Sequence, residues 1–490
     1  MPGTRKEDSR MTDDTDTAQG RAPLRLRIPA DLETPVSAYL KLRDHGAVFL
    51  LESVEQGIQL GRYSFIGLGP CTEIRLRDDI VTITRPDAGV ERHPVGDDIF
   101  AAVRRELERS AIDLPDDVPG PFGGAIGVIS YDIIRHFEPV MLPDGESDDD
   151  FRFLVPDALA VFDHVKSEIE LLVRPETDHD AARVAADRRL RGLLDGLAAP
   201  LQHPVRPDLP DAFPEPVGSV TQAQFEEMVA KAQEHILAGD AFQIVLSQRL
   251  SGRTDVAPFQ IYRALRILNP SPYLYFLDFG DTQVVGSSPE LLVRKEGRAA
   301  AVNPIAGTRP RGADPAADLA LAEELMADQK ERAEHVMLVD LGRNDLGRVC
   351  EIGSVQTETF MTIEKYSHVM HLVSRVTGTL RPELDAFDLL RATFPAGTVS
   401  GAPKIRAMQI IGEIEGQRRG PYAGAVGYFG PTGDMDLCIG IRTLFMQGNE
   451  YFIQAGAGIV ADSVPAHEYQ ETLDKIRALA RAVAIAEEGL

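Results

Sequence analysis

The last helical segment places two carboxylates and a lysine where they could act together. In residues 467–488, Glu468, Glu471 and Lys475 are spaced i, i+3 and i+7, so they share one helix face. Glu334 lies late in an earlier helical segment. Magnesium is commonly held by only one or two protein carboxylates plus substrate oxygens, so two such helices facing one pocket would suffice. The same spacing is also typical of a solvated salt-bridge face, and spacing alone leaves both interpretations open.

A histidine and an arginine lie on segments that alternate like half-buried strands. His371 in "VMHLVSRV" would share a strand face with Val369 and Val373, which suits either a hydrogen-bonded core histidine or a catalytic one. Arg442 lies in "CIGIRTLF", and a buried strand is a costly place for an arginine without an anionic partner. Its planar fork suits a carboxylate. These residues favour a site for a small dianion.

The elements that must position these residues are helices and hairpins in irregular order. We expect helices at residues 180–197, 224–240, 316–341 and 467–488, and a hairpin at 158–173. Thr221 is placed to cap the second of these helices. Without regular alternation of strand and helix, the pattern favours an α+β fold with large, mostly antiparallel sheets.

Composition divides the chain into four parts. Residues 1–23 are polar and are predicted to be a disordered tail. A connector is predicted at residues 198–219, because six prolines within it exclude a helix or a central strand. We therefore expect an N-terminal lobe at 24–197 and a second lobe at 220–490.

The charge balance excludes several classes of function. The 490 residues contain 51 Lys and Arg against 76 Asp and Glu, a net charge of −25, so binding to nucleic acid or a membrane surface is not expected. An anionic substrate therefore needs local cations. Cys71, Cys350 and Cys438 are too far apart for a disulfide framework or zinc site. With no membrane span or signal peptide in the sequence, we expect a cytoplasmic protein.

Eight segments in a fixed order carry a family resemblance. They are "GSSPELLVR", "PIAGTRPRG", "EHVMLVDLGRNDLGRV", "YSHVMHLVSRV", "PAGTVSGAPKIRAM", "RRGPYAGAVGYF", "CIGIRT" and "QAGAGIVADSVPAHEYQET". Across residues 30–485 the chain resembles the chorismate-utilising enzymes. "LLES" and "NPSPYLYF" resemble, more narrowly, the tryptophan-regulated large subunit of anthranilate synthase. The resemblance implies a four-layer α/β/β/α fold of the anthranilate synthase type, with two large, mainly antiparallel sheets.

The resemblance assigns a metal site and a substrate clamp. It implies Mg²⁺ as the cofactor, held by Glu334 and Glu471 with Glu468 nearby, while Lys475 helps to neutralise the ring carboxylate of chorismate. The clamp on the second carboxylate is implied to consist of two side chains and nearby backbone amides. These residues are Tyr422, Arg442, Ala457 and Gly458.

The resemblance also implies the catalytic residues. Glu290 matches the acid that protonates the departing ring hydroxyl, which requires a raised pKa. Thr308, beside Gly307, would orient that hydroxyl. His371 matches the family's catalytic histidine, which we assign to the second step, the loss of pyruvate from an aminated intermediate.

Two positions discriminate among reactions within the family. Relatives that form isochorismate or salicylate have a lysine where this chain has Gln243, and aminodeoxychorismate synthases usually have a lysine where it has Ala306. Neither residue present here can activate water or attack the ring. The resemblance therefore implies amination by ammonia to form anthranilate. Aminodeoxychorismate synthase and a non-catalytic regulator that binds chorismate or tryptophan are the alternatives.

The resemblance further implies partners and an inhibitor. None of the three cysteines lies in the glycine-flanked elbow of a glutaminase, so a separate glutamine amidotransferase subunit, component II, is expected to supply ammonia, in a heterotetramer of two large and two small subunits. Tryptophan is the expected inhibitor. Its predicted site consists of Glu52, Ser53, Asn269, Pro272, Tyr273 and Leu274.

Overall fold

The computed structural model describes residues 22–55, 59–115, 118, 120–145, 148–177, 179–201, 216–366 and 369–490. Almost all of the predicted tail and residues 202–215 of the predicted connector lie outside this part of the chain. None of the helices in it is long and apolar enough to cross a membrane.

A long antiparallel ribbon organises the strands. It consists of β5 (Tyr63–Arg77) and β9 (Phe151–Asp163), which pair along both halves with a register shift between Leu68 and Cys71. At this shift the hydrogen-bonded network divides into two sheets, so each half of the ribbon belongs to a different sheet.

Both sheets are antiparallel. The first runs in the order β1 (Leu24–Pro29), β10 (Glu168–Val173), β9, β5, β2 (Ala47–Glu52), β13 (Tyr273–Asp278), β14 (Thr282–Ser288), β23 (Thr443–Gln447), β24 (Glu450–Ile459) and β12 (Gln243–Arg253). The second runs in the order β7 (Gly89–Pro94), β6 (Ile80–Arg85), β5, β9, β8 (Ala125–Ile129), β21 (Ala425–Phe429), β22 (Met435–Ile439), β15 (Leu291–Glu296), β16 (Ala299–Val302), β19 (Val369–Thr379) and β18 (Gln356–Lys365). Strand β17 (Ile305–Pro310) also pairs with β19, beyond the residues of β19 that pair with β16.

Short elements complete the sheets and turns. They are the β3 (Val54–Glu55) and β4 (Gln59–Leu60) pair, β11 (Val217–Gly218) and β20 (Gly401–Ala402) beside β12, and the 3-10 helices η1 (Arg43–His45), η2 (Tyr131–His136) and η3 (Gly397–Val399).

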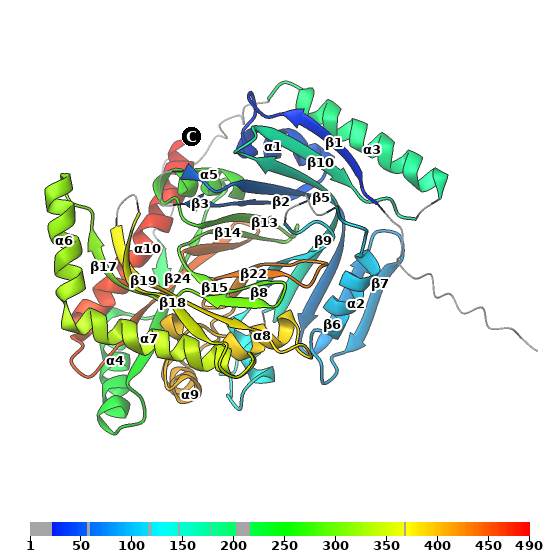
Figure 1. Cartoon of the computed structure of the whole chain (residues 1–490). Coiled ribbons are helices and arrows are strands. Elements are labelled where there is room, and N and C mark those ends of the chain that lie inside the picture. The colour runs from blue at the N-terminus through cyan, green and yellow to red at the C-terminus, as the bar shows by residue number, and fades with distance from the viewer. Residues whose placement is uncertain are drawn as a thin grey trace, which may run out of the picture.

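Helices cover the outer faces of the two sheets (Figure 1). The first sheet carries α1 (Pro35–Leu42), α3 (Asp180–Ala198), α5 (Pro258–Leu268) and α10 (Pro465–Glu488). The second carries α2 (Ala101–Ser110), α7 (Gln329–Gly347) and α8 (Ala386–Thr393). Around these lie α4 (Gln222–Leu237) and α9 (Lys404–Glu415) against β12, and α6 (Pro315–Ala327) against β19.

The inner faces of the two sheets pack on each other. Phe49 and Tyr275 of the first sheet share a buried cluster with Ile126, Leu154 and Val426 of the second. Helix, sheet, sheet and helix therefore form four layers, which confirms the predicted α+β fold of two large antiparallel sheets.

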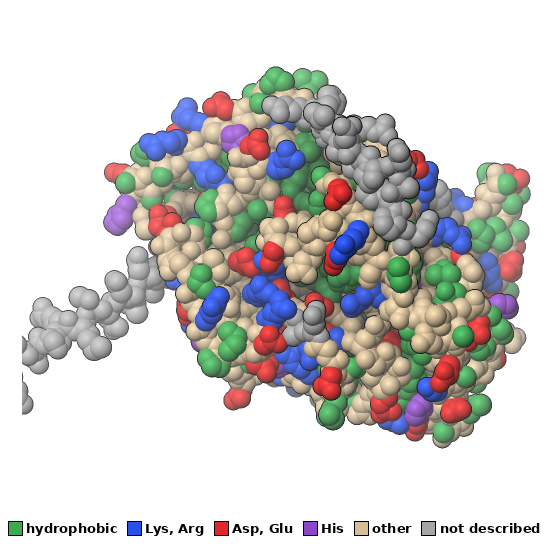
Figure 2. Space-filling model, turned by 180° about the vertical axis from the view of Figure 1, so that it is seen from behind, with side chains coloured by type: hydrophobic (Ala, Val, Ile, Leu, Met, Phe, Trp, Pro, Cys, Tyr) green, Lys and Arg blue, Asp and Glu red, His purple; other side chains and the backbone are tan. Residues whose placement is uncertain are grey.

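Each sheet contains strands from both sides of the proline-rich segment. Strand β2 pairs with β13, and β8 pairs with β21. The division into lobes at residues 24–197, 198–219 and 220–490 stays a prediction. On the face opposite to that of Figure 1, acidic and basic side chains are interspersed, so on this face the acidic excess does not form a single patch (Figure 2).

Helix capping explains why one predicted helix is confirmed and another prediction is wrong. Thr221 and Gln224 form a capping box that starts α4, as expected. The single helix expected at residues 316–341 is wrong, because the chain forms α6 and α7 with a break at Asp328. The side chain of Asp328 accepts hydrogen bonds from the backbone N–H groups of Lys330 and Glu331, so it acts as an N-cap for a new helix.

A buried ion pair at the end of α9 forms hydrogen bonds to the backbone of β12. The guanidinium of Arg419 donates to both carboxylate oxygens of Glu415 at 2.9 and 2.6 Å, and to the carbonyls of Val399 (2.6 Å) and Val245 (2.7 Å). Glu415 also accepts from the backbone N–H of Ser247 at 2.7 Å. Both charged side chains are almost fully buried, with exposed fractions of 1% and 0%. Removing one partner would leave the other charge buried and uncompensated.

Arg419→Ala should therefore lower the free energy of unfolding by about 3–5 kcal/mol. Denaturant titration followed by circular dichroism measures this change. The matched control is Arg418→Ala, since Arg418 is only half-buried and its Nε donates to the carbonyl of Pro143. We expect a loss of about 1 kcal/mol or less for this control. Equal losses in both variants would contradict the assigned role of the ion pair.

Candidate active site

Glu290 is a half-buried carboxylic acid between β14 and β15. Its backbone carbonyl accepts from the N–H of Ile439 at 3.0 Å, which fixes the backbone. Its Oε1 accepts from the hydroxyl of Thr398 at 2.9 Å. Burial raises the pKa of the Glu290 carboxyl to about 8, against the opposing effects of Thr398 and the nearby Lys475 ammonium. The side chain is therefore neutral at pH 7 and can donate a proton.

Thr398 is a site residue that the sequence analysis missed. It lies in η3, 108 residues beyond Glu290 in the chain, within the motif "PAGTVSGAPKIRAM". Only that motif points to the segment, because a single threonine in a loop has no spacing that reveals a partner.

His371, Thr308 and Gly307 meet where β17 pairs with β19. Thr308 and His371 are register partners, and the Thr308 hydroxyl lies 3.1 Å from His371 Nδ1. The carbonyl oxygen of Gly307 lies 3.0 Å from the same nitrogen. Because a carbonyl can only accept, Nδ1 carries the proton and Nε2 is the free acceptor. Burial lowers the pKa of His371, so the ring is neutral at pH 7.

The strand predicted around His371 is confirmed. In β19, His371 occupies the same face as Val369 and Val373. Gly307 has a positive φ of 66°, and a Cβ there would lie 2.9 Å from Leu325 Cδ1, so the residue type suits both the backbone and the space.

Glu471 of α10 lies close enough to two other carboxylates, Glu334 of α7 and Glu468 of α10, to raise their pKa values. Burial raises the pKa of Glu334 and of Glu468, and in both cases repulsion from Glu471 adds to the increase. Lys475 forms a 2.7 Å ion pair with Glu471. The amide of Gln243 donates from Nε2 to Glu334 Oε1 at 3.1 Å. A hard divalent cation would relieve the repulsion between these oxygen donors, so the set suits Mg²⁺.

The glycine-rich end of β24 connects these carboxylates with the substrate clamp. Lys475 Nζ donates to the carbonyl of Gly456 at 2.8 Å, and a Cβ on Gly456 would lie 2.7 Å from the hydroxyl of Tyr422. A Cβ on Gly458 would lie 2.6 Å from Gln243 Nε2. Any side chain at either glycine would therefore disturb the site. Ala457, between them, is buried.

Arg442 supplies a cation without an internal partner. It is half-buried, and within the described ranges it forms no ion pair. Burial lowers the pKa of its guanidinium, while the buried Tyr422 beside it has the opposite effect. Arg442 also lies close enough to His371 to lower the pKa of the imidazole. A ligand carboxylate would compensate this charge.

The two positions that discriminate among reactions lie in or beside this site. Gln243 lies between Glu334 and Gly458, as described, and its Oε1 is buried without a hydrogen-bond partner. Ala306 is buried in β17 opposite Leu372. At these two positions the site offers an amide and a methyl group, and neither is a nucleophile or a strong base.

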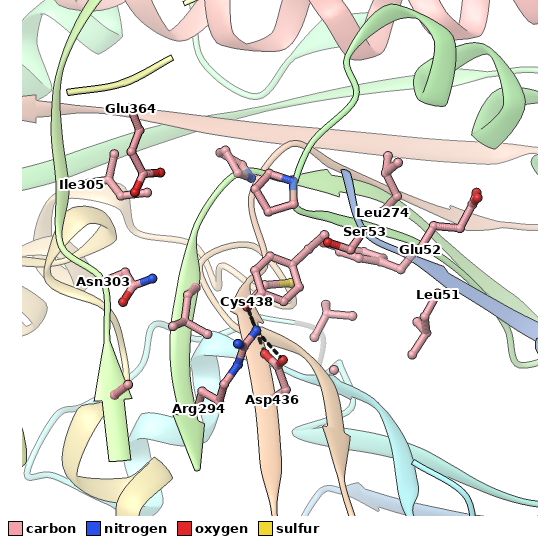
Figure 3. A pocket seen from close by; sticks show the side chains of 18 of the residues that line it. Leu51, Glu52, Ser53, Leu274, Arg294, Asn303, Ile305, Glu364, Asp436 and Cys438 are labelled. Carbon is pink, nitrogen blue, oxygen red and sulfur yellow. Dashed lines mark hydrogen bonds and ion pairs between the residues drawn. The ribbon is translucent and has the colours of Figure 1, made fainter. Parts of the chain in front are cut away.

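A second cavity of about 690 Å³ lies between the two sheets (Figure 3). Ser53, directly after β2, and Leu274 of β13 approach it from one side, while Asn303 and Glu364 lie on its opposite side. Of the six residues of the predicted tryptophan site, five line this cavity: Glu52, Ser53, Pro272, Tyr273 and Leu274.

Asn269 and Glu52 of this prediction also have contacts within the protein. Asn269 is not among the lining residues, and its backbone carbonyl accepts from the hydroxyl of Ser287. The carboxylate of Glu52 forms an ion pair with Arg266 of α5 at 2.8 Å and accepts from Tyr262. Their roles in ligand binding stay predictions.

A different group of side chains also has metal-ligand chemistry. One ligand atom each from Asp79, His136 and Asp150 lies within 4.8 Å of the others. Arg135 donates to Asp150 at 2.7 Å and to Asp79 at 3.1 Å. The group could hold a metal ion, but the arginine already compensates its carboxylates, and none of its residues belongs to the predicted magnesium site.

The Glu290 carboxyl should remain protonated at neutral pH. Infrared difference spectra between the wild type and Glu290→Gln should contain a protonated-carboxyl band that disappears as the pH rises through about 8. Thr398→Val removes a hydrogen bond that stabilises the carboxylate, so it should move this midpoint upward. Glu296→Gln, at an exposed position of β15, should leave the band unchanged. Loss of the band at the ordinary pKa of a glutamate would contradict the assignment.

The chain is similar to known proteins over most of its length. The family model for "chorismate binding enzyme" matches residues 46–481. Anthranilate synthase component 1 from Pseudomonas putida is 47% identical over 475 residues, which cover 96% of each chain. The crystal structure of anthranilate synthase component I from Streptococcus pneumoniae superposes with a TM-score of 0.75 at 40% identity and covers 93% of this chain and 99% of that one.

A more distant structure shares only the fold. The menaquinone-specific isochorismate synthase from Escherichia coli superposes with a TM-score of 0.71 at 20% identity, covering 95% of both chains. The half-buried acid, the histidine, the unpaired arginine and the neighbouring carboxylates thus occur in a chain that matches one enzyme family over most of its length. The chain belongs to the family of chorismate binding enzymes.

Proposed function

We propose that this chain is the large subunit, component 1, of anthranilate synthase. It converts chorismate and ammonia to anthranilate and pyruvate, the first committed step of tryptophan biosynthesis. The observation that carries the proposal is the neutral Glu290 acid in a site where Gln243 and Ala306 replace the lysines of relatives with other products. The component 1 names of relatives at 45–47% identity support it.

Substrate binding follows from the charges of the site. Chorismate carries two carboxylates, and Arg442 with Tyr422 and the amides near Ala457 and Gly458 would hold the enolpyruvyl one. Lys475 lies near the ring carboxylate. Glu334, Glu468 and Glu471 would hold Mg²⁺, which when bound neutralises the ring carboxylate. These local cations overcome the repulsion expected from a net charge of −25.

Different side chains act in the two chemical steps. Glu290 protonates the departing ring hydroxyl, which Thr308 orients, while ammonia forms the new C–N bond. The aminated ring must then lose a ring proton and the enolpyruvyl group to become aromatic. Neutral His371, with Nε2 free because Gly307 holds Nδ1, accepts the ring proton as pyruvate leaves.

The proposed source of the ammonia is a separate protein. Cys350 and Cys438 are buried and Cys71 is half-buried, and burial raises the pKa of each thiol. A glutaminase needs a reactive thiolate, which these cysteines do not provide. A separate glutamine amidotransferase subunit therefore supplies ammonia, in an assembly that we expect to contain two copies of each subunit.

The purified chain alone should form anthranilate from chorismate and an ammonium salt, but not from glutamine. Anthranilate fluorescence measures the product, and a chelator that removes Mg²⁺ should abolish the signal. Adding the glutaminase partner should restore the reaction with glutamine. Efficient glutamine-dependent turnover by the isolated chain would disprove the separate partner, and para-substituted aminobenzoate chemistry would disprove the reaction.

Tryptophan is the proposed inhibitor, and the cavity between the sheets is its proposed site. The cavity combines the hydroxyl of Ser53 with apolar walls from Leu274 and Pro272, which suits an indole ring with one polar edge. Its location away from the clamp at Arg442 makes the inhibition allosteric, so chorismate and tryptophan should weaken each other's binding by the same factor.

Ser53→Ala should raise the tryptophan concentration for half-inhibition by about 5- to 150-fold, because a buried polar group of the ligand loses its partner at a cost of about 1–3 kcal/mol. Calorimetry should show a matching loss of affinity. The control is Ser64→Ala, since the Ser64 hydroxyl on β5 contacts His164 at 2.8 Å and does not line the cavity. Tryptophan binding that is indifferent to Ser53→Ala would remove the proposed site.

A further inference from the structure

One strand face joins the cavity and the catalytic histidine. His371, Val373 and Arg375 are alternate residues of β19 and point to the same side of the sheet. Val373 and Arg375 line the 690 Å³ cavity, as does Ile305, the register partner of Val373 on β17. The strand face that forms this wall of the cavity therefore also carries His371.

Glu364 of β18 and Tyr366, directly after this strand, connect the cavity with His371. Glu364 and Tyr366 line the cavity, and Glu364 is the register partner of His371. The Tyr366 ring meets the His371 ring edge-on, with centroids 5.6 Å apart and an interplanar angle of 61°. The Tyr366 hydroxyl donates to Glu364 Oε2 at 2.9 Å, which orients the tyrosine.

The other contacts of His371 do not by themselves fix the orientation of its ring. On the β17 side, the Gly307 carbonyl and the Thr308 hydroxyl hold Nδ1, but one hydrogen-bonded edge still allows an imidazole to tilt. The charged groups facing it are Glu364, which raises its pKa, and Arg442, which lowers it. The Tyr366 ring, which also lines the cavity, contacts the imidazole edge-on and so limits this tilt.

We propose that Tyr366 is a positioning residue for His371 and couples the cavity to the active site. With the cavity empty, its ring holds the imidazole with Nε2 toward the substrate. A ligand that fills the cavity from Ser53 to Glu364 displaces the Tyr366 ring, and His371 loses this orientation. The coupling rests on the proposed function, which supplies tryptophan as the ligand, whereas the positioning role does not depend on it.

The titration of His371 tests the positioning role. In NMR spectra of the full chain with labelled histidines, the His371 signal is assigned by its loss in His371→Gln. Tyr366→Leu should raise the His371 midpoint, because water then reaches a ring whose pKa burial had lowered. The acidic limb of the pH–kcat profile should move in the same direction. Tyr366→Phe keeps the ring and should restore the wild-type midpoint.

The control removes a different ring from the same cavity. Tyr428 also lines the cavity, but it pairs with Ile126 and Asp436 on neighbouring strands, and no contact joins it to His371 among the described residues. Tyr428→Leu should leave the His371 midpoint unchanged. If Tyr366→Leu does not fold, Tyr366→Met replaces the ring with a flexible chain of similar reach and carries the same expectation. An unchanged midpoint in a folded Tyr366 variant overturns the positioning role.

Tryptophan tests the coupling. Wild type and Tyr366→Phe should bind tryptophan by calorimetry, shift the His371 signal and lose activity. Tyr366→Leu should bind tryptophan within about threefold of wild type, yet the factor by which tryptophan weakens chorismate binding should fall from the allosteric range of about 5- to 150-fold toward 1. Full inhibition of Tyr366→Leu overturns the coupling. Failure of the wild type to bind tryptophan overturns the proposed regulation and the coupling together, while the titration still decides the positioning role.

Discussion

The buried pair of Arg419 and Glu415 is the constraint on which the arrangement of the active site depends. A buried charge is tolerated only when every donor and acceptor around it is satisfied, so the segments that contribute these partners must meet at one point. Val399, whose carbonyl accepts from Arg419, follows Thr398, the donor to Glu290. Val245, the other carbonyl partner, lies two residues beyond Gln243, the donor to Glu334. One interaction thus sets the backbone beside both the acid and the carboxylates.

The distribution of charge explains how an acidic protein accommodates a dianion. Arg442 lacks an internal partner in the described part of the chain, and Lys475 reaches the same pocket from α10. Glu471 lies close enough to Glu334 to raise its pKa, and the proposed Mg²⁺ would relieve this repulsion. In the proposed complex, the charges of substrate, metal and protein compensate one another. At Glu290, burial keeps the carboxyl protonated although the nearby Lys475 ammonium and the Thr398 hydroxyl both favour the carboxylate.

The space between the two sheets gives the molecule a second site next to the first. Side chains from β2 and β13 form one wall of the cavity and those of β18 and β19 the other, so its contents affect the packing of both sheets. Close-packed interiors respond to such changes by shifting between discrete arrangements. The ring contact between Tyr366 and His371 lies on this boundary. The proposed regulation therefore acts over one ring contact and does not require a long pathway.

The sequence by itself determined the local features and the family. The spacing of Glu468, Glu471 and Lys475, the Thr221 cap and the alternation around His371 depend on residues within one or two turns, so they are readable from the chain. The ordered motifs identified the family. Only the tertiary structure decided that Thr398 bonds Glu290 and that Tyr366 touches His371. It also showed that Asp328 starts a new helix. Contacts between residues far apart in the chain and the pKa shifts caused by burial depend on how the sheets and helices pack, which local patterns do not encode.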